Sequence, residues 1–203
     1  MRSHKLRWSP DMNNDTQPVI VTQHLDLIHL GAADTVALFE TPDDPHLFSG
    51  SSFTNPHRVL MSQDGPLRWR VPQIKADESM NKWFVRLMVL RSTGVVIGST
   101  SFHGPPDQRG MLEIGIGVER IFQRQGFATQ ALLGMWKWAG AEPGVKVFRY
   151  QVGVNNIASQ QLIRKMGFTC VGQDIDEIDG LEDIYELTVD EFRQRGLMPT
   201  VTP

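Results

Sequence analysis

The sequence holds a single cysteine, Cys170, among its 203 residues. No disulfide can form within the chain, which agrees with a reducing compartment such as the cytoplasm. Because Cys170 lies in the apolar run 168–171, we expect a buried structural thiol rather than a nucleophile. Apolar runs of the roughly 18–20 residues that a membrane span requires are also missing. The positive N-terminus is not followed by an apolar segment, so we expect no signal peptide.

An excess of basic charge is missing as well. The 20 Lys and Arg against 23 Asp and Glu give a net charge of -3, which argues against a general nucleic-acid binder. The six histidines lack the spacing of a ligand pair, so we expect no structural metal. Neither a Gly-x-Gly-x-x-Gly nor a Gly-Lys-(Ser/Thr) motif occurs, which argues against a Rossmann turn or a P-loop. Length and composition predict a flexible tail over 1–17 and a single domain over 18–198.

The most informative stretch is 111–139. Four apolar residues between 112 and 118 alternate with Glu and Gly, a period of two that predicts a strand. Apolar residues then recur at helical spacing from Ala128 to Ala139, which predicts a helix that begins near Gly126. A short turn with Arg120 and Arg124 lies between them. Free N–H groups and the macrodipole at such a helix start, beside a glycine that a ligand can approach, favour phosphate binding.

The remainder of the chain reads as alternating strands and helices joined by turns rich in Gly, Pro and Asn. We expect loops over 42–56 and 64–78, with Trp69 as a plug in the core rather than packed with Arg70 over a cleft. A hairpin turn is expected at Asp179-Gly180. Further strands are expected over 19–30, 83–90, 95–102, 145–154, 168–172 and 184–187, and helices over 35–41 (capped by Asp34), 57–63, 157–166 and a last turn capped by Asp190.

Two motifs resemble a known family. Gln123-x-x-Gly126-x-Ala128 matches the (Gln/Arg)-x-x-Gly-x-(Gly/Ala) turn of the GNAT family of N-acetyltransferases. About 30 residues later, Asn156-x-x-Ser159 is followed by an apolar helix and Gly-Phe, the second half of the same signature. The resemblance covers about 18–192 and is greatest to the branch with the ribosomal-protein N-terminal acetyltransferases. It implies an α/β (α+β) GNAT fold, whose mixed, mostly antiparallel sheet of about seven strands has helices on both faces and a splayed V between the fourth and fifth strands.

The resemblance also implies acetyl-CoA as co-substrate, with its pantetheine arm hydrogen-bonded to strand backbone and its pyrophosphate in the turn. The residues that it assigns to acetyl-CoA are Ile116, Gly117 and Val118 for pantetheine, Gln123, Arg124, Gln125, Gly126, Phe127 and Ala128 for the pyrophosphate, and Asn156 and Ser159 near the thioester.

Acetylation of an amine requires the nitrogen to lose protons and the thiolate to leave. Glu113 matches a position that serves as a base in some relatives, or it positions substrate and neighbouring side chains. Many relatives supply a Tyr as general acid four residues before Gly167, where this chain has Ile163. Ser159 could donate to the sulfur instead or be an ordinary helix-start residue, and the thiolate could leave without an acid. His103 could be a base, or a surface or capping histidine.

The resemblance implies an acetyl-CoA-dependent N-acetyltransferase that transfers acetyl directly to a primary amine, and the single cysteine agrees with a cytoplasmic location. A protein N-terminus, a polyamine, an amino-sugar antibiotic and a free amino acid all stay open as acceptor, and so does a homodimer. The competing hypothesis is a non-catalytic acyl-CoA-binding or sensing domain, which the missing Tyr favours. We expect no metal, nucleic acid or membrane partner.

Overall fold

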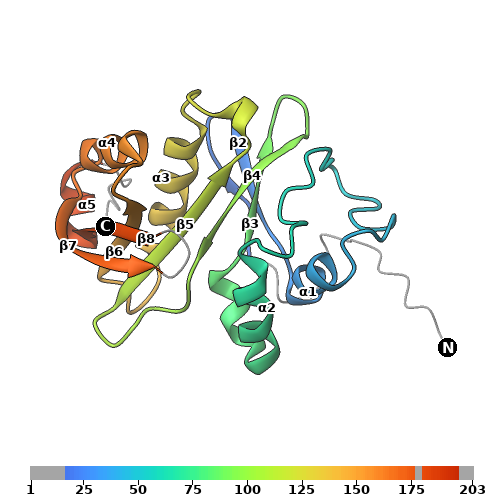
Figure 1. Ribbon diagram of the computed structural model, residues 1–203, viewed down its shortest axis with the longest axis horizontal. Helices are drawn as coiled ribbons and strands as arrows, with labels where there is room; N and C mark the ends of the chain where they lie inside the picture. Colours follow the sequence, from blue (N-terminus) through green and yellow to red (C-terminus); the bar gives the residue numbers. More distant parts are fainter. Residues whose placement is uncertain (1–16, 177–179, 197–203) are drawn as a thin grey trace, which may run out of the picture. The chain divides into compact units, whose positions relative to one another are not determined.

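The computed structural model describes residues 17–176 and 180–196 (Figure 1). The expected tail over 1–17, apart from its last residue, and part of the expected Asp179-Gly180 turn lie outside the described residues. The chain divides into two compact units. The N-terminal unit consists of the described residues up to Ser101 together with Ile116–Ala131. The C-terminal unit consists of Phe102–Gly115 together with the described residues from Leu132 onward. A single domain over 18–198 stays a prediction.

Within the described residues, eight strands follow one another in the hydrogen-bonded order β1-β2-β3-β4-β5-β6-β8-β7. The β5–β6 ladder is parallel, whereas the ladders β1–β2, β2–β3, β3–β4, β6–β8 and β7–β8 are antiparallel. The predicted mixed, mostly antiparallel sheet is therefore confirmed, with a two-residue β1 as the additional strand. The strands are β1 Ile20–Val21, β2 Leu25–His29, β3 Arg86–Leu90, β4 Val96–Phe102, β5 Met111–Val118, β6 Val147–Gly153, β7 Thr169–Asp176 and β8 Gly180–Thr188.

The helices of the described chain are short. The longest, α3, has 13 residues, and none is long and apolar enough to span a bilayer. Their bounds are α1 Ala32–Glu40, α2 Leu67–Ala76, α3 Phe127–Ala139, α4 Ile157–Lys165 and α5 Val189–Gln194, with 3₁₀ turns at η1 Glu78–Trp83 and η2 Arg120–Phe122.

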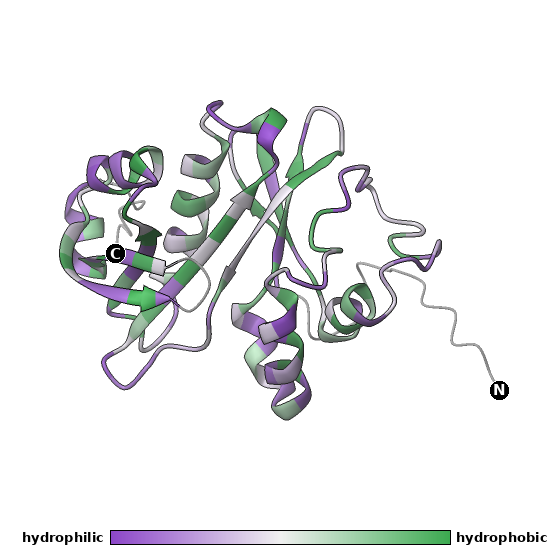
Figure 2. Ribbon diagram, viewed as in Figure 1, coloured by the Kyte–Doolittle hydropathy of each residue, from purple (hydrophilic) through white to green (hydrophobic). Residues whose placement is uncertain are grey.

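Apolar alternation gives β5 a buried face and a polar face. Figure 2 shows green residues alternating with pale or purple ones along this strand. Leu112 and Ile114 are buried, whereas Glu113 between them is not. Successive side chains of a strand point to opposite faces, so the polar side chain stays accessible while its neighbours anchor the strand.

The C-terminal unit has an aromatic core around Trp136 of α3, which is fully buried. The ring of Phe168 lies 4.7 Å away between centroids, and the rings of Phe148 and Phe192 lie 6.0 and 6.2 Å away. These rings come from β6, α5 and the residue before β7. Their burial fixes the second half of α3 against the strands that carry the polar residues described below.

Several predictions for the N-terminal unit are wrong. Residues 57–63 form turns rather than a helix, because Arg58 and Leu60 have φ values of 54° and 67°, outside the right-handed helical region. The expected loop at 64–78 instead holds α2, whose face of Leu67, Val71 and Ile74 is buried. This apolar face outweighs the hydrogen bond that Pro72 removes from the helix.

Two predicted caps and two predicted burials are also wrong. The N-cap of α1 is Gly31, three residues before Asp34, and the N-cap of α5 is Thr188, whose capping box with Glu191 takes the place expected for Asp190. Trp69 is 47% exposed, since it lies on the face of α2 opposite the buried one. Cys170 is exposed because it belongs to β7, the edge strand of the sheet, all eight residues of which are exposed.

Candidate functional site

The turn between β5 and α3 has a constrained backbone. Gly126 has a φ of 82° and Arg124 a φ of 64°, both in the left-handed region. A side chain in that region costs about 1–3 kcal/mol, so Arg124 holds a strained conformation that its surroundings impose. The side-chain amide of Gln123 donates to the carbonyl of Val118 at 2.9 Å, and that of Gln125 donates to the carbonyl of Ile121 at 3.1 Å. The Gln123 contact ties the turn to the last residue of β5, and the Gln125 contact closes the turn on itself.

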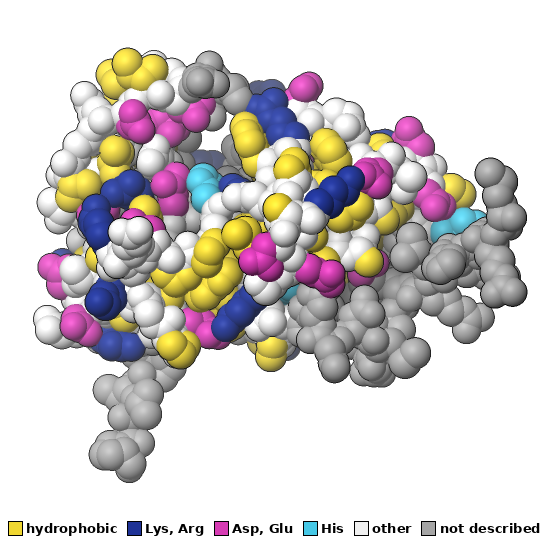
Figure 3. Space-filling view, turned by 90° about the horizontal axis from the view of Figure 1, so that it is seen from below, with side chains coloured by type: hydrophobic (Ala, Val, Ile, Leu, Met, Phe, Trp, Pro, Cys, Tyr) yellow, Lys and Arg dark blue, Asp and Glu magenta, His cyan; other side chains and the backbone are white. Residues whose placement is uncertain are grey.

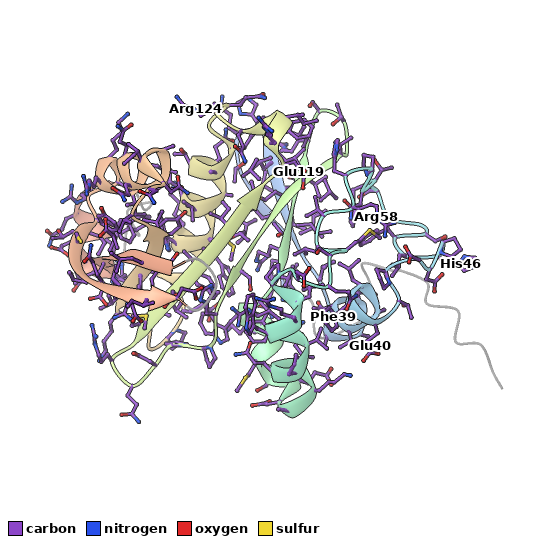
Figure 4. The ribbon with its side chains drawn as sticks, in the orientation of Figure 1. Phe39, Glu40, His46, Arg58, Glu119 and Arg124 are labelled. Atoms are coloured by element: carbon purple, nitrogen blue, oxygen red, sulfur yellow. The ribbon has the colours of Figure 1, made fainter. Side chains whose placement is uncertain are left out.

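The first turn of α3 presents backbone donors. The first intrahelical bond runs from the N–H of Gln130 to the carbonyl of Gly126 at 3.1 Å. By helix geometry, the N–H groups of Phe127 and Ala128 therefore point out of the helix start. Arg120 and Arg124 are exposed near this start, and Figure 4 labels Arg124 at the turn. Donors, macrodipole and two guanidinium groups together suit a pyrophosphate.

The last residues of β5 lie close to β4 on one flank and have space elsewhere. A Cβ added to Gly98 would overlap the carbonyl oxygen of Gly117 and lie 3.1 Å from the Cα of Val118. A Cβ added to Gly117 would meet nothing within 4 Å. The backbone at Gly117 and Val118 thus lies against β4, and the position of a Cβ at Gly117 is open. A pantetheine arm that pairs with the strand backbone fits this arrangement.

The C-terminal unit gathers acid–base groups around Glu113 of β5. One carboxylate oxygen, Oε1, lies 3.0 Å from Nδ1 of His103, and Oε2 accepts a hydrogen bond from the side-chain amide of Gln151 at 3.2 Å. The backbone N–H of His103 also donates to the carbonyl of Glu113 at 2.9 Å. The Glu113 side chain is 19% exposed and that of His103 is 46% exposed. Both oxygens of a half-buried carboxylate are thereby engaged.

A second polar group continues along the same strands. Arg149 is the register partner of both Glu113 on β5 and Glu186 on β8. Its Nη2 donates to Oε1 of Glu186 at 2.6 Å, and Arg109 approaches the same carboxylate at 3.2 Å. Figure 3 shows that acidic and basic side chains are interspersed on the face it presents. In this group the two carboxylates, of Glu113 and Glu186, are balanced in charge by the two guanidinium groups, of Arg149 and Arg109.

Asn156 and Ser159 meet at the start of α4. The side-chain oxygen of Asn156 accepts a hydrogen bond from the N–H of Ser159 at 3.2 Å, so Asn156 is the N-cap of the helix. This contact gives the Asn-x-x-Ser motif a structural role beside any role in binding. Ile163 is fully buried.

Sequence reasoning missed Tyr150, which hydrogen-bonds to Ser159. Burial of Tyr150 raises the pKa of its phenol, the hydrogen bond with Ser159 lowers it, and the charge of Glu182 raises it. The signal in the sequence was the alternation of β6, which puts Tyr150 on the buried side with Phe148. The phenol of Tyr150 is therefore a neighbour of Ser159, although Ile163 occupies the helical position where many relatives have a Tyr.

The predicted site residues fall into two groups, each in its own unit. Ile116, Gly117, Val118 and the turn from Gln123 to Ala128 belong to the N-terminal unit. Glu113, Asn156 and Ser159 belong to the C-terminal unit. Glu113 is in contact with His103 and Gln151, of which Gln151 was missed because its role depends on the register between β5 and β6.

Comparison with known proteins identifies a protein family that matches most of the chain. Residues 24–169 match the family model described as an acetyltransferase (GNAT) domain. The chain is 29% identical over 82 residues to a Bacillus subtilis (strain 168) protein named as the uncharacterized N-acetyltransferase YjdG. That alignment covers 40% of this chain and about half, 49%, of the relative.

Solved structures share the fold. The ribosomal-protein-S5-alanine acetyltransferase from Vibrio fischeri superposes with a TM-score of 0.61 at 14% identity, over 87% of this chain and 99% of that one. RimL, a ribosomal L7/L12 alpha-N-protein acetyltransferase solved with coenzyme A, gives a TM-score of 0.57 at 16% identity, over 86% of this chain and 99% of that one. At such identities the likeness concerns the fold.

Proposed function

The chain belongs to the GNAT acetyltransferase family, and from this premise we propose that it is an acetyl-CoA-dependent N-acetyltransferase. The acceptor in this proposal is a primary amine of a protein N-terminus or of a small molecule. Similar folds belong to enzymes named for ribosomal-protein substrates and to one named for spermidine, so the proposal keeps both kinds of acceptor. We place the enzyme in the cytoplasm, in agreement with its single cysteine. In this proposal residues 18–198 form one domain.

The observation that carries the proposal is the turn before α3. Gly126 adopts a φ of 82°, and the turn that precedes the helix also carries the exposed side chains of Arg120 and Arg124. In the proposal, the residues from Gln123 to Ala128 bind the pyrophosphate through backbone donors and the helix dipole. The backbone of Ile116, Gly117 and Val118 binds pantetheine next to the open flank at Gly117.

Acetyl-CoA supplies an activated thioester, and the polar residues of the C-terminal unit supply proton transfer. The carboxylate–imidazole pair of Glu113 and His103, held by the amide of Gln151, accepts a proton from the amine. Ser159, with Asn156 holding the helix start, donates a hydrogen bond to the leaving sulfur. Tyr150 is hydrogen-bonded to this serine and so helps to hold its hydroxyl in place.

A non-catalytic acyl-CoA sensor is the second candidate. The fully buried Ile163, at the position where many relatives supply a Tyr acid, favours it. A sensor keeps the pyrophosphate turn and loses the chemistry. The paired side chains of Glu113 and His103 favour the enzyme, since a sensor has no need of an acid–base pair.

Thermal melting with and without acetyl-CoA, followed by thiol release across peptide and amine acceptors, tests the proposal. At a hundred times Kd, a ligand of the folded state adds about 2.7 kcal/mol, which for this length raises Tm by roughly 5–10 °C. Gly126→Trp should abolish that rise. Gly144→Trp is the matched control, because Gly144 has a φ of 86° and open space around it like Gly126.

The outcomes separate the candidates. A rise in Tm together with thiol release for one class of acceptor supports the enzyme and identifies its substrate. A rise without release for any acceptor favours the sensor. Absence of a rise in excess acetyl-CoA, or an equal rise for wild type and Gly126→Trp, refutes acetyl-CoA binding at the turn.

A further inference from the structure

The contact between Glu113 and His103 assigns the base to a particular atom. We propose that Nε2 of His103 takes the proton from the acceptor amine and that Glu113 is a positioning residue for this imidazole. The inference rests on the proposed acetyltransferase function. It begins from two contacts of one carboxylate, Oε1 with Nδ1 of His103 at 3.0 Å and Oε2 with the amide of Gln151 at 3.2 Å.

The carboxylate selects the tautomer of the imidazole. A carboxylate can only accept, so a neutral His103 at 3.0 Å from Glu113 carries its proton on Nδ1. The other nitrogen, Nε2, then has a lone pair and can act as a base. The same logic governs hydrolases in which a carboxylate orients a histidine through Nδ1. Gln151 holds the second carboxylate oxygen, which limits rotation of the Glu113 side chain.

Gly115 makes room for this ring. A Cβ added there would lie 3.0 Å from Nε2 of His103, closer than ordinary van der Waals contact. The imidazole therefore lies over the β5 backbone two residues beyond Glu113. The His103 side chain is 46% exposed against 19% for Glu113, so an incoming amine reaches the imidazole more readily than the carboxylate.

Other charges around the pair are balanced. Within the C-terminal unit, Arg149 is the register partner of Glu113 and forms its ion pair with Glu186, which Arg109 also contacts. Asp107, in the loop that follows His103, accepts hydrogen bonds from the backbone of that loop. Glu113 is thus the carboxylate in direct contact with the imidazole.

The proton balance is complete with these groups. An ammonium R–NH₃⁺ loses one proton to Nε2, and the ring becomes an imidazolium held by Glu113. The amine lone pair forms the C–N bond to the acetyl carbon, the C–S bond breaks, and the thiolate leaves with the electron pair. A second proton leaves the nitrogen and neutralises the thiolate, and the imidazolium returns its proton to water. The sum is ammonium plus thioester giving amide, thiol and one proton.

Kinetics of the full chain test the assignment. Removal of a general base costs about 10²–10⁴-fold, so His103→Ala should lower kcat by that factor, with an unchanged rise in Tm from acetyl-CoA and partial recovery in added imidazole. Glu113→Gln should lower kcat by about 10–100-fold, as outer partners that orient a ligand do. Gly115→Ala should also lower kcat, because its Cβ displaces the imidazole. His46→Ala, an exposed histidine elsewhere, is the matched control.

A measurement without turnover accompanies these assays. In ¹⁵N NMR of the histidine rings, assigned by the signal that His103→Ala removes, neutral His103 should carry its proton on Nδ1, and Glu113→Gln should weaken that preference. A proton on Nε2 in wild type overturns the assignment. So does a His103→Ala variant with the kcat and rising pH limb of wild type, or a Glu113→Gln loss greater than that of His103→Ala. Wild type that releases no thiol with any amine refutes the proposed function, and the base role with it.

Discussion

Replacement of Gly98 by alanine tests how closely β4 and β5 approach each other in the N-terminal unit. The added Cβ would overlap the carbonyl oxygen of Gly117 and lie 3.1 Å from the Cα of Val118. Both contacts are with backbone, so no side-chain rotation relieves them and a strand must shift. Overpacking of this kind typically costs about 1–3 kcal/mol.

The cost is measurable as a melting temperature. For a chain of this length, 1 kcal/mol corresponds to about 2–4 °C, so Gly98→Ala should lower Tm by roughly 2–12 °C. Gly117→Ala is the matched control on the facing strand, because its Cβ enters open space. Its Tm without ligand should stay close to that of wild type. Circular dichroism melts of the three proteins decide the comparison.

Acetyl-CoA gives the same pair of variants a second readout. If pantetheine lies along the backbone at Gly117, a methyl group in that open space should reduce the ligand-induced rise in Tm while leaving the ligand-free Tm in place. Gly98→Ala should change both. A Gly98→Ala protein that melts with wild type, or a Gly117→Ala protein that melts below it, would refute the close approach of β4 to β5 at Gly117 and the open space on its other side.

Two further predictions concern the C-terminal unit. Burial raises the pKa of Tyr150, so the unfolded chain loses the phenolic proton first, and stability that is complete below about pH 10 is lost as pH rises from there toward the folded-state pKa. Melts between pH 8 and 11 should show this decline in wild type and less of it in Tyr150→Phe. Arg149→Ala should cost about 1–3 kcal/mol in urea unfolding because it removes two charged hydrogen bonds to the largely buried Glu186. Arg58→Ala, which removes an exposed pair, should cost less than about 1 kcal/mol, and equal costs would contradict this account.

The turn at the centre of the site was predictable because its signals are local. Alternation over 112–118 and helical spacing from Ala128 to Ala139 each need only neighbouring residues, and α3 begins at Phe127, one residue after the predicted Gly126. The end of β5 at Val118 was likewise given by the loss of alternation. Such patterns are decided by which side of an element is apolar, which the composition of the element itself determines.

The failures lie where distant packing decides. Arg58 and Leu60 adopt positive φ values. Neither residue type favours such a conformation, so the sequence predicted a helix there. Pro72 suggested a loop, although the buried face of α2 tolerates it. Cys170 is apolar and was expected in the core, but its strand is at the edge of the sheet. The contact of Glu113 with Gln151 needs a β5–β6 register, and that register is a property of the whole sheet.

The sequence Glu-Ile-Gly-Ile-Gly of β5 shows why one strand can combine proton transfer and cofactor binding. Side chains alternate between faces while the backbone continues unchanged, so the two functions do not compete for the same atoms. Glu113 provides a carboxylate on the polar face, and Gly115 leaves space on it for the ring of His103. Gly117, two residues on, leaves the backbone itself accessible. Alanine at Gly115 should therefore affect kcat with little effect on acetyl-CoA binding, and alanine at Gly117 should do the reverse. If both substitutions changed only kcat, or both changed only acetyl-CoA binding, the separation of the two functions along β5 would be refuted.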